Sequence, residues 1–252
     1  MSLRARYGLF GVSAAILGAL FVWAITGLPA FGDFHGEYGR ILNGVAVHER
    51  HATNVVVAVT FDYRGFDTLG EEFILFAAVT GVALLLREAR DREQERPYDA
   101  AHSDAVRGIG LTLVPAAVVL GLYVIAHGTL TPGGGFQGGV VTASGLVLVY
   151  AAGQYRAYRA SSPQALVDLA EGTGAGGFAA VGIASLVAGF AFLYNFLPLG
   201  TTGSLASAGT ITVENAAVGL EVTAALVLLF HEFLEELMDP TSPGGQPREA
   251  GV

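Results

Sequence analysis

The stretch GIGLTLVPAAVVLGLYVIA (residues 108–126) contains no charged side chain and sets the fold class of this chain. It opens a longer uncharged run, Gly108 to Tyr155, and two further runs, Tyr7 to Phe31 and Gly172 to Val213, also lack Asp, Glu, Lys and Arg. About 20 apolar residues cross the hydrocarbon core of a bilayer as a helix. Each run is therefore long enough for at least one crossing, and the sequence predicts a polytopic membrane protein.

The composition of the whole chain excludes several classes of protein. Of its 252 residues, 52% are hydrophobic and 14% are charged, whereas a soluble domain carries about 25% charged residues. The net charge is −9 and the chain has no lysine, which argues against a nucleic-acid partner because phosphate binding needs a basic surface. The chain has no cysteine, which excludes disulfides, thiolate metal sites and cysteine nucleophiles. We expect neither a cofactor, nor a metal, nor a catalytic residue, and hence no enzyme.

The arginines predict the orientation of the helices. With an even number of spans, ten arginines fall on one side of the membrane and three, Arg40, Arg50 and Arg64, on the other. Arginine is enriched in cytoplasmic loops, so both termini are expected in the cytoplasm. We predict an all-α transmembrane helix bundle, multi-pass in the cytoplasmic (inner) membrane of a prokaryote. Its six spans cover about residues 7–29, 68–86, 108–126, 136–152, 176–197 and 213–234.

A mixed-charge stretch, Arg87 to Asp104, divides the chain. Neither a bilayer nor a packed core accepts such a run, so we interpret it as a solvated connector on the cytoplasmic side. The predicted division has four parts: a two-span part at 1–90, a linker at 91–106, a four-span part at 107–240 and a polar tail at 241–252.

The most unusual stretch, HGTLTPGGGFQGG at residues 127–139, joins the third and fourth predicted spans. Each glycine destabilises a helix by about 1 kcal/mol, and proline lacks a backbone donor. Irregular backbone at membrane depth persists only where protein or a water-filled cavity satisfies its polar groups. Both a tight interhelical turn and a break that lines an ion path fit the stretch. His127 is expected at the membrane interface. The residues that define the break are Pro132, Gly133, Gly134, Gly135 and Phe136.

Acidic residues begin the second predicted span. Residues 54–61 are apolar but too few to cross a bilayer, and we interpret them as a surface-lying or partly inserted segment. Asp67 can cap the helix that follows, and acidic groups in its first turn interact favourably with the helix dipole. That explanation suffices for Glu72. It is weaker for Glu71, because a carboxylate that faces lipid or a packed interior is expensive.

The last predicted span carries Glu214 and Glu221, seven residues apart on nearly one helix face. We expect Glu214 to be hydrated at the outer boundary. Glu221 lies deeper, where an acid marks a functional site by default, although a structural acid bonded to a neighbouring subunit also fits. The candidates for an ion or proton path are Glu71, Glu221, Glu214, Asp67 and His127.

The stretch 127–139 resembles the signature of the B-type (MnhB/MrpB-like) subunit of Mrp-type (multiple resistance and pH) multi-subunit Na⁺/H⁺ antiporters, and the resemblance covers Arg107 to Leu237. Residues 212–222, TVENAAVGLEV, are similar to the last helix of that family. Residues 61–71, FDYRGFDTLGE, are similar to the E-subunit-like domain of membrane-bound hydrogenases, which in many Mrp systems ends the large A-type subunit. The chain thus resembles a fusion of that domain with a B-type subunit.

The resemblance implies an accessory subunit in a hetero-oligomeric complex that exchanges cytoplasmic Na⁺ for external protons. Its partners would be subunits of the A, C, D, E, F and G types, Na⁺ and H⁺, and the lipid bilayer. In that family the positions of Pro132, Phe136 and Glu71 are implicated in transport. Three alternatives stay open: a purely structural assembly subunit, the membrane subunit of an ion-pumping, hydrogenase-related redox complex, and a stand-alone carrier, which the few buried charges favour least.

Overall fold

The computed structural model describes residues 3–28, 31–32, 36–89 and 103–237. The chain forms two compact units, Met1–Ile41 and Leu42–Val252. The first contains α1 (Leu3–Thr26), whose side chains are exposed along its apolar length, and the first residues of α2 (Glu37–Arg50). The predicted linker lies mostly outside the described residues and the predicted tail entirely so.

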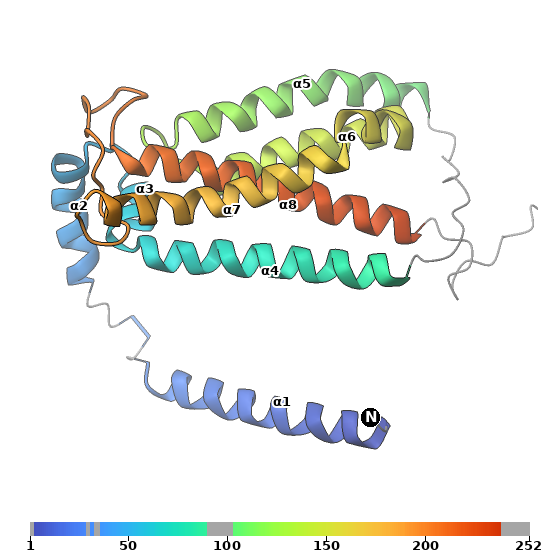
Figure 1. Ribbon diagram of the computed structural model, residues 1–252, viewed down its shortest axis with the longest axis horizontal. Coiled ribbons are helices and arrows are strands. Elements are labelled where there is room, and N and C mark those ends of the chain that lie inside the picture. Colours follow the sequence, from blue (N-terminus) through green and yellow to red (C-terminus); the bar gives the residue numbers. More distant parts are fainter. Residues whose placement is uncertain (1–2, 29–30, 33–35, 90–102, 238–252) are drawn as a thin grey trace, which may run out of the picture. The chain divides into compact units, whose positions relative to one another are not determined.

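The second unit is a bundle of long helices, drawn in Figure 1. Within the described residues it contains no strand, as the all-α prediction requires. Its elements are the rest of α2, α3 (Val55–Ala58), the π-helical turn η1 (Val59–Tyr63), α4 (Gly65–Ala89), α5 (Asp104–Ala126), α6 (Gly135–Ser161), α7 (Gln164–Val187) and α8 (Thr210–Leu237).

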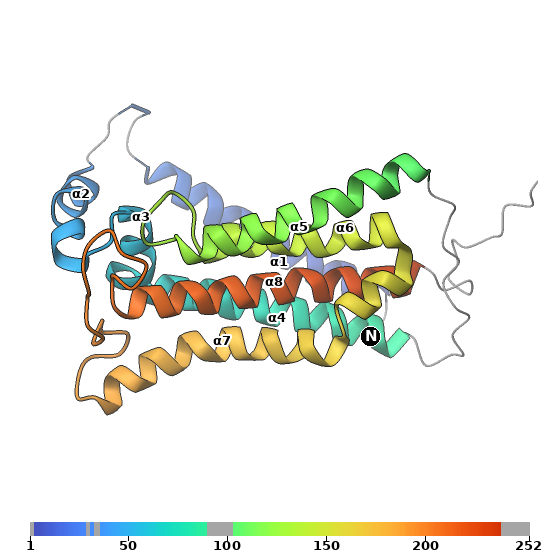
Figure 2. The same ribbon diagram turned by 90° about the horizontal axis from the view of Figure 1, so that it is seen from above.

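Five described helices are long and apolar enough to cross a membrane: α1, α4, α5, α6 and α8. They correspond to five of the six predicted spans, and the chain is a multi-pass membrane protein. The fifth predicted span, 176–197, has the wrong ends, because α7 begins after Pro163 and stops at Val187. Gly189, with φ +87°, terminates the helix, and the Phe190 amide bonds back to the Ser185 carbonyl at 2.9 Å. Although α7 falls outside the five, it packs along α8 (Figure 2).

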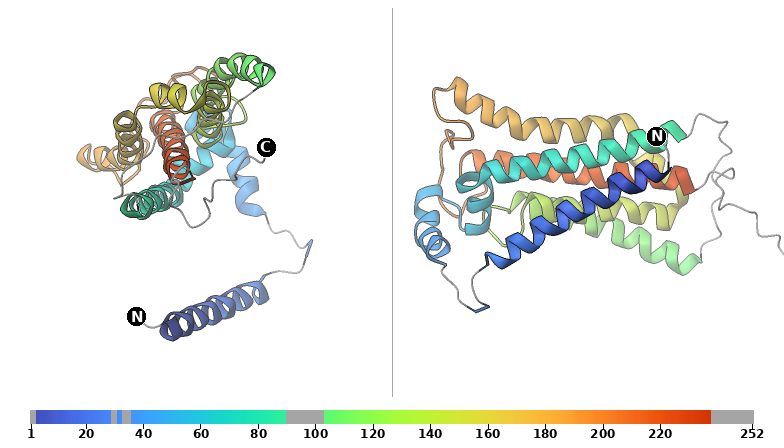
Figure 3. Two further views of the ribbon diagram at one scale, coloured as in Figure 1. Left: turned by 90° about the vertical axis from the view of Figure 1, so that its right-hand side faces the viewer. Right: turned by 90° about the horizontal axis from the view of Figure 1, so that it is seen from below.

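The central helix of the bundle is α8. It packs against α4, α5, α6 and α7, and an end-on view places it among them (Figure 3). In its apolar span 61% of the residues are buried, whereas in that of α5 only 11% are. Glycines bring the helices close: a Cβ on Gly219 would lie 2.7 Å from the Ile125 side chain, and one on Gly121 would meet Thr142. Close helix approach through small residues is typical of membrane bundles.

One end of the bundle, which we call the cap end, is covered by the C-terminal part of α2, α3, η1, the turn 127–134 and the loop 188–209 (Figures 1 and 2). The surface-lying position expected for residues 54–61 is wrong, because Val57, Ala58 and Phe61 are buried in a core cluster. That cluster includes Phe178 of α7 and Val218 of α8. This short apolar segment therefore packs against α7 and α8 through its buried residues.

Candidate functional site

The glycine-rich stretch is a turn between α5 and α6 that Asn54 holds from one side. The Asn54 Nδ2 group donates to the carbonyl oxygens of Gly128 at 2.8 Å, Thr131 at 2.9 Å and Gly133 at 3.3 Å. The Asn54 amide donates to the Thr129 carbonyl at 3.0 Å. One buried asparagine thus satisfies carbonyls that have no partner within a helix.

Asn215 of α8 holds the same turn from the other side. Its Oδ1 accepts the Gly135 amide at 2.6 Å, and its Nδ2 donates to the Ile125 carbonyl at 2.7 Å. Gly133 and Gly134 have φ values of +136° and +150°, which L side chains rarely adopt. The turn interpretation is therefore correct, and protein side chains satisfy the backbone at the break.

The turn also lines a cavity of about 270 Å³ between α4, α6 and α8. Its polar lining comes from Glu71, Glu72, Thr60, Thr68 and Gln137. Val56, Val57, Phe61, Gly133, Gly134, Gly135, Phe136 and Val218 complete it. The same stretch is thus both a tight turn and part of a cavity lining, so the two interpretations of residues 127–139 do not exclude each other. That ions pass through this cavity stays a prediction.

Two buried acids meet beside this cavity. Glu72 of α4 is 2% exposed and Glu221 of α8 is 0% exposed. Their side chains interact with each other, and in the part of the chain that the structure describes neither Glu221 oxygen nor the Glu72 Oε2 has a hydrogen-bond partner. Two like charges so close together inside a bundle repel each other, so a proton or a cation at this pair would relieve the repulsion.

A third acid reaches the pair from α7. Glu171, 4% exposed, interacts with Glu221 electrostatically. The approach of α7 depends on Gly174, where a Cβ would lie 2.6 Å from the Glu221 amide nitrogen and Cβ. Three helices therefore bring three carboxyl groups into the interior of the bundle.

Glu214 is also buried, which overturns the expected hydration at the outer boundary. It is 0% exposed, and neither carboxyl oxygen has a hydrogen-bond partner among the described residues. The physical reason is the cover at the cap end, where the loop 188–209 and η1 lie over the start of α8 (Figure 1). The nearby charge that acts on Glu214 is Asp62 of η1.

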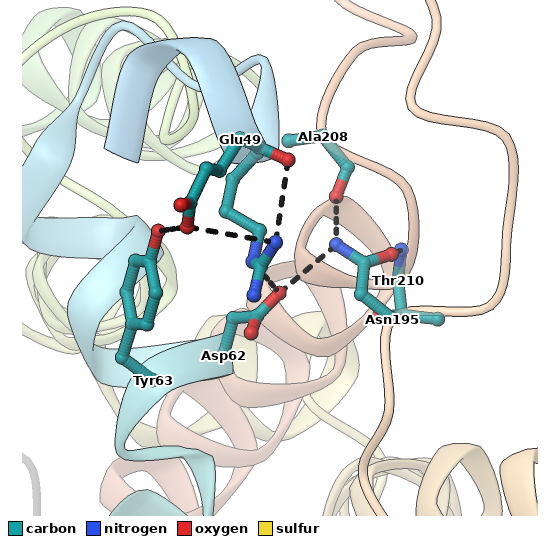
Figure 4. A network of polar contacts seen from close by, with 7 residues as sticks. Glu49, Asp62, Tyr63, Asn195, Ala208 and Thr210 are labelled. Carbon is teal, nitrogen blue, oxygen red and sulfur yellow. Dashed lines mark hydrogen bonds and ion pairs between the residues drawn. The ribbon is translucent and has the colours of Figure 1, made fainter. Parts of the chain in front are cut away.

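Asp62 belongs to a polar network at the cap end (Figure 4). Its Oδ2 pairs with the Arg50 Nε at 2.7 Å and accepts from the Asn195 Nδ2 at 3.2 Å. Asn195 also bonds the Ala208 carbonyl and the Thr210 amide, and so ties the loop to the first residue of α8.

Tyr63 extends this network. Its hydroxyl donates to Glu49 Oε2 at 2.5 Å, and the Arg50 guanidinium lies 4.8 Å from the centre of its ring. Burial and, next, the hydrogen bond to Glu49 raise the pKa of Tyr63 to about 12. The phenol therefore stays protonated and donates at neutral pH.

The other predicted candidates lie nearer the surface. Glu71 is exposed, although it lines the cavity next to Glu72. Asp67 is exposed and accepts from the Arg64 Nε at 2.6 Å. His127 is half-buried and stacks on Tyr123, with ring centres 3.9 Å apart. Pro132 and Phe136 are exposed as well. Of the five candidates for the ion or proton path, only Glu214 and Glu221 are buried.

Sequence reasoning missed Glu72, Asn54 and Asn215. Glu72 had a detectable signal, because it shares a helical face with Leu69 and Val79, which are both buried. No local sequence pattern marks Asn54 or Asn215, because each forms hydrogen bonds with backbone groups that lie far away in the sequence. In the part of the chain that the structure describes, no group of three or more His, Cys, Asp or Glu side chains could hold a metal ion.

Comparison with known proteins gives one family match and two curated relatives. Residues 105–228 match the family model "Domain related to MnhB subunit of Na+/H+ antiporter". An uncharacterized protein of Methanocaldococcus jannaschii is 30% identical over 84% of this chain and 88% of its own length. A probable K⁺/H⁺ antiporter subunit of the combined A/B type, from Rhizobium meliloti, is 33% identical over 44% of this chain and 13% of its own length.

Two solved membrane complexes contain similar chains. One is the membrane-bound sulfane sulfur reductase, an archaeal respiratory membrane complex, with TM-score 0.70 and 29% identity over 92% of this chain and 99% of that chain. The other is the Mrp complex of a Dietzia species, with TM-score 0.63 and 26% identity over 100% of this chain and 27% of that chain. The chain therefore corresponds to a whole subunit of the first complex and to one part of a longer subunit of the second.

Proposed function

Because the chain belongs to the family of domains related to the MnhB subunit of Na⁺/H⁺ antiporters, we propose that it is an accessory membrane subunit of a hetero-oligomeric monovalent cation/proton antiporter. Its partners are the other antiporter subunits, of the A, C, D, E, F and G types, and its ions are Na⁺ and H⁺. The complex resides in the cytoplasmic membrane of a prokaryote, with both termini of this chain in the cytoplasm. The chain itself is not an enzyme.

The observation that carries the proposal is the Glu72–Glu221 pair beside the cavity of the glycine turn. An acid inside a membrane bundle is costly and marks ion or proton pathways. Two neighbouring acids that disfavour charging each other inside a bundle can take up a proton and release it again, which is the step an exchanger needs. The chain contributes this step together with lysine-bearing subunits, since it has no lysine of its own.

We also propose that residues 1–90 form the E-subunit-like domain fused to the B-type domain at 107–240. The similarity to the M. jannaschii protein and to both solved complexes extends well beyond residues 105–228, which supports this assignment. The contact of α4 with α8 joins the two predicted parts in one unit.

A second candidate function is the membrane subunit of an ion-pumping redox complex. The favouring observation is that the chain covers 99% of a subunit of the sulfane sulfur reductase complex, against 27% of the Mrp chain. In that case the redox cofactors would belong to other subunits. A neighbouring gene for an iron–sulfur or nickel subunit, and its copurification with this chain, would favour the redox complex.

The deciding measurement is Na⁺-dependent dissipation of a proton gradient in everted vesicles, with the complete set of subunits and with this chain omitted. We expect omission to abolish exchange and re-supply of the chain to restore it. Unchanged exchange in an intact complex without the chain would contradict the antiporter proposal.

A further inference from the structure

A series of three side chains leads from the surface of the cap end into the bundle. The side chain of Arg50 is 29% exposed, that of Asp62 is 11% exposed, and Glu214 is 0% exposed. Arg50 pairs with Asp62, and Asp62 is the charge that acts on Glu214. The decreasing exposure orders them from water to the interior, with Asp62 between the solvent and the buried acid.

Glu214 needs a positive charge that the described residues do not supply. Both of its oxygens are buried and lack a hydrogen-bond partner there. An uncompensated buried carboxylate is strongly unfavourable, so the group requires a proton or a bound monovalent cation. Asp62 lies near the start of α8, because Asn195 bonds both the Asp62 carboxylate and the Thr210 amide, and it is therefore the candidate for the group that passes the ion to Glu214.

The Arg50 side chain has two acidic neighbours, Asp62 and Glu49, and could pair with either of them. Arg50 faces a second carboxylate, Glu49, whose Oε2 lies 4.0 Å from the Arg50 Nη1, and the Tyr63 ring flanks the guanidinium at 4.8 Å. Arg50 can therefore leave Asp62 without losing an acidic partner. Asp62 sits in a π-helical turn closed by the Arg64 amide and the Val59 carbonyl at 2.8 Å, and such turns occur frequently at functional sites.

We propose that the Arg50–Asp62 ion pair is a gate at the cap end, and that Asp62 transfers a monovalent cation, a proton or Na⁺, between the adjoining aqueous phase and Glu214. When Arg50 pairs with Asp62, the gate is closed. When Arg50 pairs with Glu49 instead, the Asp62 carboxylate can take the ion. In the proton case, Asp62 gives its proton to the Glu214 carboxylate and becomes the carboxylate itself, so the charge balances. The proposal deepens the proposed antiporter function and rests on it.

The absence of cysteine from the chain allows a direct test of access. Glu214→Cys introduces its only thiol, and the probe is a small, membrane-impermeant methanethiosulfonate applied to the assembled complex. Labelling of this chain is followed by mass spectrometry. We expect slow labelling with Arg50 present and labelling up to about fivefold faster with Arg50→Gln, because an ion pair of this kind is worth up to about 1 kcal/mol.

Two control variants separate gating from a general loss of structure. Arg40→Gln makes the same substitution at an exposed position of α2 and should leave the labelling rate unchanged. Arg50→Lys keeps the charge and should keep labelling slow. Equal labelling rates in the Arg50 and Arg50→Gln backgrounds would overturn the gate. Because the assay measures access and not transport, its result is independent of whether the complex proves to be an antiporter.

A second experiment identifies the ion. A hydrophobic carbodiimide modifies protonated buried carboxyl groups, so its reaction with Glu214 is measured in the wild-type chain by peptide mass spectrometry. Protection by Na⁺ at constant pH would assign Na⁺ to the site, and protection only on raising the pH would assign a proton. Asp62→Asn should slow the onset of either protection about tenfold, since it removes the transferring group. If neither condition protects Glu214, the transfer step is wrong.

Discussion

Glu72 of α4 and Glu221 of α8 are both buried inside the bundle, where their side chains interact with each other. The two helices come from opposite sides of the charged stretch that divides the sequence. The pair therefore forms only when both predicted parts pack together. Because two buried negative charges repel each other, this contact responds to protonation and to cations.

Glu221→Gln is expected to lower Na⁺-dependent proton exchange by about 100-fold, a size typical of losing a positioned acid–base group. Glutamine retains hydrogen-bonding capacity but cannot carry the proton. The measurement is exchange in everted vesicles, with complex assembly checked by size exclusion. Asp104→Asn, at an exposed acid in the first turn of α5, is the matched control and should leave exchange intact.

Glu72→Gln should produce a similar loss, and the double variant should be hardly worse than either single one. Residues that act as one unit are non-additive, because the first substitution already removes the shared function. Additive losses in the two single variants and the double variant would show that the two acids work separately.

Gly135→Ala is expected to destabilise the complex by about 1–3 kcal/mol, the usual range for overpacking. A Cβ there would overlap the Asn215 carbonyl oxygen and lie 2.8 Å from the Gly219 amide nitrogen, and both atoms are backbone. Gly176→Ala in α7 is the control, since a Cβ at that position meets nothing within 4 Å. Thermal unfolding in detergent should separate the two variants, and equal melting temperatures would contradict the close packing of α6 on α8.

Asn54→Ala should destabilise the turn between α5 and α6 by about 1–3 kcal/mol for each carbonyl left buried without a donor. The Asn54 side chain donates to the carbonyls of Gly128, Thr131 and Gly133. Backbone amide exchange in residues 128–135 should accelerate as well. Asn43→Ala, at an exposed asparagine on α2, serves as the control and should leave exchange in the turn as in the wild type.

Tyr63 makes stability at the cap end depend on alkaline pH. Its folded pKa of about 12 exceeds the ordinary value of 10.0, so the phenol contributes stability that is complete below pH 10 and is lost as pH rises through about 12. Tyr63→Phe should remove this part of the alkaline destabilisation. The check is the difference in tyrosinate absorbance between wild type and Tyr63→Phe, which should rise near pH 12; a rise near pH 10 would rule out the protected phenol.

Five of the spans were predictable because hydropathy is a local property of the chain. The fifth predicted span failed because α7 begins with a polar half that contains Asp168 and Glu171. The charged residues lower the mean hydropathy of this half, so a span chosen by hydropathy leaves it out. In the folded chain, however, Glu171 is buried and interacts with Glu221. The helix start at Pro163 carried a usable signal, since proline is common at the beginning of helices.

The acids show how far the candidate site was predictable. Glu221 was identified from its depth in an apolar helix, and its burial agrees with that argument. Glu214 was expected to be hydrated because it lies near a helix end, yet the loop 188–209 and η1 cover that end. Glu71 was preferred to Glu72, although the helical period of Leu69 and Val79 indicates that Glu72 faces inward.

The sequence by itself determined that this chain is a helical membrane protein, where most of its spans lie, and that its glycine-rich turn is a special element, because these properties depend on neighbouring residues along the chain. Only the tertiary structure decided which acids meet, which are covered, and which asparagines hold the turn. The physical reason is that burial and pairing depend on contacts between distant segments. The Glu72–Glu221 pair, the Arg50–Asp62 pair and the bonds from Asn54 and Asn215 all join residues from different elements, and no local pattern specifies such contacts.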